Sequence, residues 1–165
     1  TGDYLSGSFS ADFNFGTDSY TVEMWVRPDA VADIRGLFAV SGGSGSFPKF
    51  VIHLDSGTPS IHYNVLTNGS NLYTNATSAI SANVWTHIAF CRNATTWYWF
   101  INGTQSGTGS NSTNITFTTQ ASYVGYGGEA YFTAFNGYID DLRITKGVAS
   151  YTANFTPPTA PFPVG

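Results

Sequence analysis

Hydrophobic and polar residues alternate along short stretches of this chain with a period of two. A period of two is typical of a β-strand whose two faces meet different surroundings. The clearest example covers residues 20–27, and Pro28, which has no backbone N–H to donate, is expected to end it. One side of this strand carries Tyr20, Val22, Met24 and Val26, and the other carries Thr21, Glu23, Trp25 and Arg27.

Similar apolar stretches recur along the chain, and Gly, Asn and Ser interrupt them about every ten residues. No convincing helix is present, apart from a single helical turn expected at 149–153. The spacing predicts an all-β, antiparallel two-sheet sandwich. The glycine-rich runs 42–46 and 107–113 are expected to be loops, because strands resume after each. The expected strands are 20–27, 36–40, 49–54, 60–65, 72–74, 85–92, 96–101, 104–105, 121–126 and 138–144.

Two local signals refine this picture. Asn102-Gly103 between two strands is typical of a type I′ hairpin turn. The strand at 96–101 is apolar on both faces, with Trp97, Trp99 and Ile101 on one and Tyr98 and Phe100 on the other. Antiparallel sheets usually keep one face in water. The sequence therefore predicts that one sheet is covered on both sides, by the partner sheet and by loops or a neighbouring subunit.

The last strand, 138–144, is followed by a tail stiffened by Pro157, Pro158, Pro161 and Pro163. Proline fixes φ and cannot donate to a ladder, so this tail cannot be a central strand. It is expected to run over the surface or to lead to a neighbouring segment. At 165 residues the chain is expected to be one domain, 1–165, with the proline-rich tail at 155–165.

Composition narrows the function classes. Charged residues make up only 10% of the chain and aromatic residues 16%, with a net charge of −4. No cluster of Lys and Arg is present, which argues against nucleic acid. No apolar run approaches the ~20 residues of a membrane span, and no signal-like N-terminus is seen. Cys91 is the only cysteine, lies in an apolar stretch and is expected to be buried and inert.

Three blocks in fixed order carry a resemblance to a known family: 20–28, 85–103 and 137–144. They resemble the laminin-G-like, concanavalin A-like jelly-roll domains, and together they span nearly the whole chain. The extension 145–163 is similar to the variant that recurs in tailed-phage virion proteins, including tail fibres. The resemblance implies a two-sheet jelly roll, often a binding or adhesion module, with carbohydrate as a frequent ligand. The ligand itself does not follow from the fold.

The same family includes glycosidases, so the resemblance also raises the question of catalytic carboxylates. Glycoside hydrolysis needs two carboxylates converging across the scissile bond. Neither Glu23 nor Glu129 has a carboxylate two residues away, and adjacent Asp140 and Asp141 would face opposite sides of a regular strand. No nucleophile elbow is present. The sequence predicts no catalytic residues, and the chain is expected not to be an enzyme.

Two pairs of residues bear on metal binding. His53 and His62 are expected to be neighbours across a hairpin near residues 57–59, as ordinary cross-strand partners rather than metal ligands. One structural calcium is a candidate cofactor, because sandwiches of this type often hold an ion between the N-terminal segment and the last strand. Asp3 and Asp140 are its candidate ligands. The alternative is that Asp140 and Asp141 bind loop amides or pair with Arg143 or Arg27.

Exposed aromatic rings that stack on pyranose rings, with amides and hydroxyls around them, would bind sugar. The loop aromatics are the first candidates, and packing on the sheet edge or on a partner is their alternative role. Trp25, Trp85, Trp97 and Trp99 lie in strands and are expected to be core. The candidate carbohydrate-binding residues are Tyr73, Asn71, Tyr126, Glu129 and Tyr131.

Together these features predict a non-enzymatic virion module on a phage tail fibre, tail spike or capsid exterior. It would bind a host-surface glycan or a neighbouring virion protein, as a homo-oligomer or as part of a larger assembly. The alternative is a secreted carbohydrate-binding lectin domain, or one related to glycoside hydrolases.

Overall fold

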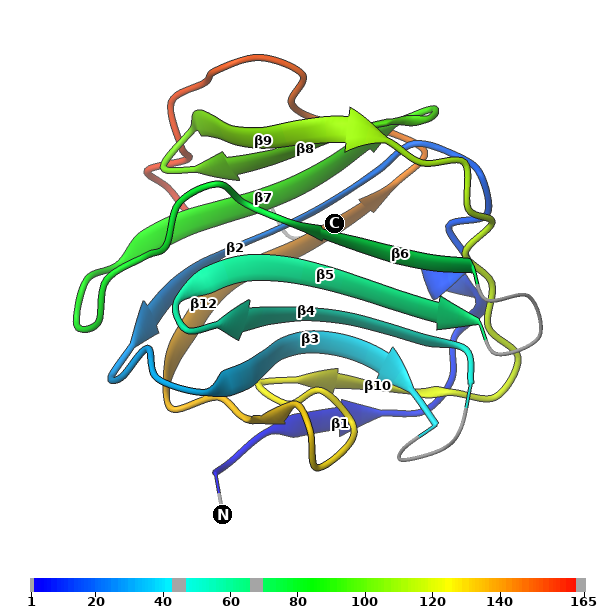
Figure 1. Ribbon diagram of the computed structural model, residues 1–165, viewed down its shortest axis with the longest axis horizontal. Helices are drawn as coiled ribbons and strands as arrows, with labels where there is room; N and C mark the ends of the chain where they lie inside the picture. Colours follow the sequence, from blue (N-terminus) through cyan, green and yellow to red (C-terminus); the bar gives the residue numbers. More distant parts are fainter. Residues whose placement is uncertain (1, 43–46, 66–69, 163–165) are drawn as a thin grey trace.

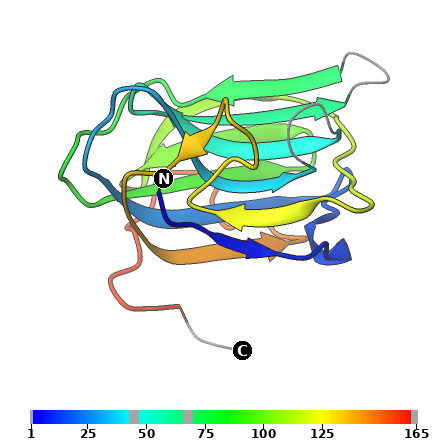
Figure 2. The same ribbon diagram turned by 90° about the horizontal axis from the view of Figure 1, so that it is seen from below.

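The computed structural model describes residues 2–42, 47–65 and 70–162, and its elements are strands with one short 3-10 helix, Ala11–Phe13. The strands form two stacked sheets (Figures 1 and 2). The expected all-β, antiparallel two-sheet sandwich is confirmed. The described residues contain no helix long and apolar enough to cross a bilayer.

One sheet has seven strands, in the order β1-β10-β3-β4-β5-β6, with β11 pairing alongside β3. Neighbours on the main path are antiparallel, while β11 runs parallel to β3. Figure 1 shows β3, β4, β5 and β6 side by side. The strands are β1 (Leu5–Gly7), β3 (Ile34–Ser41), β4 (Lys49–Asp55), β5 (Thr58–Val65), β6 (Ser70–Asn75), β10 (Ala121–Val124) and β11 (Thr133–Ala134).

The other sheet has five strands, in the order β12-β2-β7-β8-β9, all antiparallel. The expected turn at Asn102-Gly103 joins β8 to β9, and both residues have positive φ, as a type I′ turn requires. The strands are β2 (Tyr20–Pro28), β7 (Thr86–Asn93), β8 (Thr96–Ile101), β9 (Thr104–Ser110) and β12 (Gly137–Lys146).

The main core lies between the sheets and follows the alternation read from the sequence. The inward residues of β2, from Tyr20 to Val26, meet Phe38, Phe50 and Tyr63 of the opposite sheet in one buried cluster. Arg92 is buried beside them and donates hydrogen bonds to the carbonyls of Ala94, Thr113 and Thr17. A buried cation is tolerated there because its donors are satisfied.

The C-terminal segment covers the outer face of the five-stranded sheet, the face turned away from the core. Tyr151 and Phe155 pack on Ala89, Cys91 and Phe100. Figure 2 shows the segment, in red, leaving on the side of β12 and away from β5 and β6. The prediction of one sheet covered on both sides is therefore confirmed. The covering layer is this chain's own tail, as far as Phe162; residues 163–165 lie outside the described part.

Several local expectations were wrong. Residues 149–153 form no helical turn. Their backbone is bound to the sheet instead, where Ser150 N donates to Thr21 Oγ1 at 2.8 Å. Strand β9 continues to Ser110, into part of the expected loop at 107–113, because its pairing with β8 extends to Thr96. Strand β1 was not predicted. Residues 43–46 of the expected loop at 42–46 lie outside the described residues.

Cys91 confirms the expectation of a buried thiol. It lies beneath the tail with no exposed surface, and burial raises the pKa of this thiol to about 11. A thiol that stays protonated is a poor nucleophile.

Candidate functional site

The connection from β10 to β12, residues 125–136, lies across the outer face of the seven-stranded sheet and includes β11. Its Phe132 is buried against Ala39 and Val51 of that face. The close approach depends on Gly36, because a Cβ there would lie 2.1 Å from the backbone nitrogen of Gly127. Because Gly36 has no side chain, the connection can lie directly on β3 at this position.

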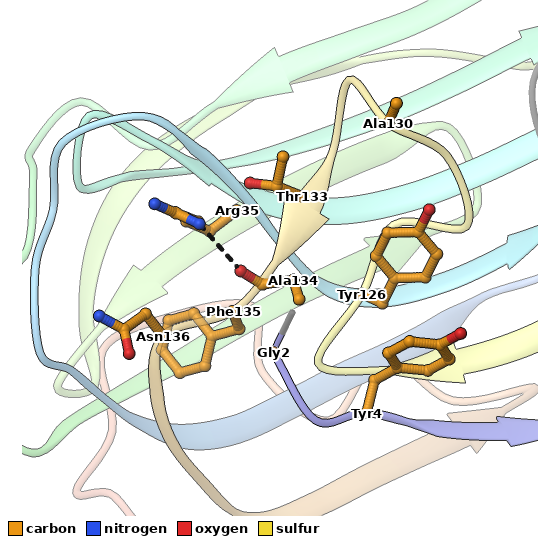
Figure 3. Close-up of a pocket in the computed structure, with 9 residues that line it drawn as sticks. All are labelled: Gly2, Tyr4, Arg35, Tyr126, Ala130, Thr133, Ala134, Phe135 and Asn136. Carbon is orange, nitrogen blue, oxygen red and sulfur yellow. Dashed lines mark hydrogen bonds between the residues drawn. The ribbon is translucent and has the colours of Figure 1, made fainter.

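A cavity of about 620 Å³ opens beside this connection, at the β1–β10 edge, and is called the edge cavity here (Figure 3). Tyr4 and Tyr126 form one wall, stacked with ring centroids 4.8 Å apart. Arg35 and Asn136 lie across from this pair in Figure 3. The remaining lining residues are Gly2, Ala130, Thr133, Ala134 and Phe135.

Two polar side chains of the edge cavity, those of Arg35 and Thr133, come from β3 and β11. The Arg35 guanidinium donates to Asp33 Oδ2 at 2.8 Å and to the carbonyl of Ala134 at 3.2 Å. The Thr133 hydroxyl donates to the carbonyl of Ile34 at 2.9 Å. Within the described residues the exposed Asn136 amide side chain has no hydrogen-bond partner. The cavity therefore offers an aromatic wall and polar groups on opposite sides.

A second feature, called the aromatic row here, crosses the outer face of the same sheet. Each ring touches the next: Tyr73 to His62 at 6.0 Å, His62 to Phe132 at 5.8 Å, and Phe132 to Tyr131 at 4.9 Å, between centroids. Tyr73 and Tyr131 end the row with 56% and 66% of their surface exposed. A polar hollow of about 250 Å³ adjoins Tyr73, lined also by Asp55, Thr58, Ser60 and Asn75.

Charged groups beneath the row are paired. Lys49 and Glu129 form an ion pair that is largely buried. Burial and the Lys49 ammonium lower the pKa of His62. His53, packed on Phe132 at 4.8 Å, is 2% exposed, and burial lowers its pKa to about 4. Both histidines are therefore neutral near pH 7.

The family follows from comparison of the chain with known proteins. The model of the concanavalin A-like lectin/glucanases superfamily matches residues 1–152. The chain belongs to this superfamily. A search of curated proteins gives no match.

Solved structures share the fold of this concanavalin A-like chain at low identity. The CBM40 of the Ruminococcus gnavus IT-sialidase, bound to alpha2,3 sialyllactose, has a TM-score of 0.68 at 14% identity, covering 83% of this chain and 80% of that chain. Domain 4 of AbnA, a GH43 extracellular arabinanase from Geobacillus stearothermophilus, in complex with arabinotriose, has a TM-score of 0.62 at 21% identity, covering 81% and 63%. A SAP-like pentraxin from Limulus polyphemus has a TM-score of 0.56 at 17% identity, covering 77% and 63%.

Of the five sugar-binding candidates, three tyrosines lie on the two features of this concanavalin A-like domain. Tyr126 lines the edge cavity, while Tyr73 and Tyr131 end the aromatic row. Glu129 is held in the ion pair with Lys49. Asn71 pairs with Asn64 through the backbone of β6, and its side chain lies outside the described residues.

Of the residues that line the edge cavity, the sequence predicted only Tyr126, and it missed the three other side chains on which the site depends: Tyr4, Arg35 and Asn136. They come from three distant segments, which the sheet order β1-β10-β3 and the pairing of β11 with β3 bring together. The one available signal was the candidate calcium site, which would bring the N-terminal segment close to the last strand.

The calcium candidates do not fit a common site. Asp3 lines a hollow at the β1–β12 side with Gly137 and Ile139, whereas Asp140 lines a different cavity with Trp25. The described residues contain no group of three or more His, Cys, Asp or Glu side chains able to hold a metal. His53 and His62 lie diagonally on neighbouring strands, since His53 is paired with Ser60 and His62 with Val51.

Two expectations about the five-stranded sheet were wrong. Trp99 is buried and Trp97 packs on the core, but Trp25 lies on the outer face and Trp85 is 43% exposed. Asp140 and Asp141 line the same cavity instead of opposite faces. The reason is a register shift between Asp140 and Arg143, with Asp141 at φ 48°, which breaks the regular alternation.

Proposed function

We propose that this domain binds glycans without cleaving them, and that the edge cavity holds the sugar. The observation that carries the proposal is the edge cavity itself, in which the Tyr4–Tyr126 pair lies across from Arg35 and Asn136. Ligand sites of ~300–1,000 Å³ usually combine an apolar wall with a few polar groups that fix orientation. An aromatic wall suits the apolar face of a pyranose, and the amide and guanidinium suit its hydroxyls.

Likeness to solved structures adds support of a weaker kind. Two proteins of similar fold are described as bound to sialyllactose and in complex with arabinotriose. At 14% and 21% identity these likenesses concern the fold, so the residues of the edge cavity must carry the argument for this chain.

We further propose that the domain belongs to a phage virion, where it attaches the particle to a host-surface glycan. The support is the resemblance of the extension 145–163 to that of tailed-phage virion proteins. A shallow, open site binds one sugar weakly, and many copies on one particle would raise the avidity by 10²–10⁴. The competing role, in which the tail packs against neighbouring virion proteins, loses support because Tyr151 and Phe155 pack on this chain's own sheet.

The absence of catalysis is part of the proposal. A glycosidase general acid is a carboxyl kept in an apolar setting, but Glu23 is held by three donor residues and Asp140 is exposed. Incubation of the protein with the polysaccharide that it binds should release no reducing sugar. Release that is abolished by Asp140→Asn would overturn this part.

A glycan array followed by calorimetry tests the binding. Tyr126→Ala should weaken the affinity for the best glycan about tenfold or more, the loss expected for one stacking ring and its buried area. Tyr73→Ala and Tyr131→Ala serve as matched tyrosine controls on the aromatic row. If these two abolish binding and Tyr126→Ala does not, the sugar belongs on the row. Blank arrays with folded protein would overturn glycan binding altogether.

A further inference from the structure

Another cavity lies on the other sheet, between the outer face of the five-stranded sheet and the C-terminal segment. It has a volume of about 460 Å³ and is called the tail cavity here. Its sheet side carries two indoles and two carboxylates: Trp25, Trp85, Asp140 and Asp141. Residues 158–161 form the other side.

The walls of the tail cavity are held in place. The C-terminal segment is fixed before the cavity, where Phe155 N donates to the carbonyl of Gly103 at 2.9 Å. It is fixed after the cavity, where the Arg143 guanidinium lies 3.8 Å from the centroid of the Phe162 ring. Pro158 and Pro161 stiffen the span between these points. The cavity is thus a built feature with a rigid outer wall.

The two carboxylates of the cavity have no cationic partner among the described residues. The two arginines that were the alternative partners of these aspartates are engaged elsewhere: Arg27 lies over the Tyr138 ring and beside Asp29, and Arg143 binds Glu23. Among residues 2–42, 47–65 and 70–162, the Asp140 carboxylate accepts a single hydrogen bond, from the backbone nitrogen of Asp141 at 2.8 Å. The backbone bulge that turns both aspartates to one cavity therefore gives it an uncompensated negative charge.

We propose that the tail cavity binds a quaternary ammonium group, such as that of choline. A cation of this kind is attracted to the faces of tryptophan rings and to nearby carboxylates, and needs no hydrogen-bond donor. A neutral sugar fits less well, because it would leave the negative charges of both carboxylates unbalanced. A calcium or magnesium ion fits less well too, because it needs six or more oxygen ligands and gains nothing from the indole faces.

Choline and its neutral isostere 3,3-dimethylbutan-1-ol provide the test, since they differ in charge but hardly in shape. Binding is followed by intrinsic tryptophan fluorescence and by calorimetry on the whole chain. We expect choline to bind at least tenfold more tightly than the isostere and to weaken as salt is raised. Equal binding of the two compounds, or no binding of choline up to about 100 mM, would overturn the proposal.

Variants locate the site. Trp85→Ala and Asp140→Asn should each reduce choline affinity about fivefold or more, and urea unfolding checks that both remain folded. Asp18→Asn, an exposed carboxylate with no side-chain contact in the described residues, is the matched control. Unchanged affinity in both test variants would place choline elsewhere and refute the assignment.

Two further experiments identify the source of the ammonium group and separate this site from the edge cavity. Co-sedimentation with phosphatidylcholine vesicles, sensitive to Trp85→Ala, would assign the ammonium group to a lipid headgroup; choline binding without co-sedimentation would assign it to a free molecule. Tyr126→Ala should leave choline affinity unchanged, because the edge cavity lies on the other sheet. The outcome is therefore independent of the proposed glycan site.

Discussion

Glu23 shows how a single buried charge is accommodated in this fold. Its carboxylate has no exposed surface and accepts hydrogen bonds from Arg143 at 2.8 and 2.6 Å, from Tyr151 at 2.9 Å and from His87 at 3.2 Å. Burial acts to raise the pKa of Glu23, but the hydrogen bonds from His87, Arg143 and Tyr151 outweigh it and lower this pKa. The carboxylate thus links β2, β7, β12 and the tail.

Loss of the Glu23 charge should destabilise the folded protein. Glu23→Gln removes the charge that balances Arg143 and turns an amide N–H toward another donor, so we expect the free energy of unfolding to fall by about 3 kcal/mol. Urea unfolding at pH 7 measures this. The matched control, Asp18→Asn, should change stability by less than about 0.5 kcal/mol. A loss that small in Glu23→Gln would show that the buried network contributes little.

His53 supplies a pH dependence with a definite sign. Burial, followed by the neighbouring His62, lowers the pKa of His53 from 6.5 to about 4. Between pH 6.5 and about pH 4, His53 binds a proton in the unfolded chain but stays neutral in the folded chain. The free energy of unfolding therefore decreases as the pH falls through this range. The ring packs on Phe132, and its Nδ1 has no partner.

His53→Phe should remove this loss. Between pH 7.5 and pH 5 we expect the wild-type protein to lose about 2 kcal/mol that the variant keeps. Urea unfolding of both proteins at the two pH values measures the difference. The comparison at pH 7.5, where the histidine is neutral in both states, isolates the packing effect of the new ring. Parallel pH profiles of the two proteins would show that His53 does not titrate as inferred.

At the scale of elements, the alternation of the sequence predicted most of what forms locally. The strands with long alternating or apolar runs, such as β2 and β8, lie where they were expected. Errors fall where pairing decides instead of composition. Strand β1, with only three residues, exists because β10 offers a partner, and the Ala149 region is extended because it docks on Thr21.

The turn at Asn102-Gly103 illustrates the same limit. Its sequence identifies the turn type, and the structure confirms it. The sequence does not reveal that the C-terminal segment packs against this turn. A Cβ on Gly103 would lie 1.9 Å from the carbonyl oxygen of Phe155. That second role depends on a contact across some fifty residues, which no local pattern encodes.

The tail as an element should be fastened mainly by its aromatic residues. Phe155 stacks on Tyr151 with ring centroids 3.5 Å apart and packs on Phe100 at 5.3 Å. Phe155→Ala should lower the free energy of unfolding by about 2 kcal/mol, less than a fully buried Phe loses, because Phe155 is half-buried.

A second readout separates undocking of the tail from loss of packing alone. Cys91 lies beneath the tail, so Phe155→Ala should speed its reaction with a disulfide reagent under native conditions. Tyr131→Ala, on the other sheet, is the control and should leave the rate unchanged. An unchanged rate in Phe155→Ala would mean that the tail stays docked without this ring.

At the scale of the whole molecule, the fold could be predicted from the sequence, but the two cavities could not. The two-sheet architecture follows from periodicity and from three ordered blocks. The edge cavity does not, because Tyr4, Arg35 and Asn136 meet only through the order of strands in the sheet. The tail cavity was missed for a different reason: regular strand geometry puts Asp140 and Asp141 on opposite faces, and the bulge reverses this.

The two sheets should unfold together, because they share one core. Tyr20, Met24 and Trp99 from the five-stranded sheet and Phe38 and Phe50 from the seven-stranded sheet belong to a single buried cluster. Opening either sheet would expose the inner face of the other, so no half-folded state is expected to be populated.

The positions of the tryptophans make this testable. Trp25, Trp97 and Trp99 lie in strands of the five-stranded sheet and Trp85 directly precedes β7, so fluorescence reports on that sheet while far-ultraviolet circular dichroism reports on both. In urea the two signals should give the same midpoint and the same slope m. Midpoints that differ beyond error would mean that the seven-stranded sheet, with the edge cavity, opens separately, and glycan binding would then be lost before the tryptophan signal changes.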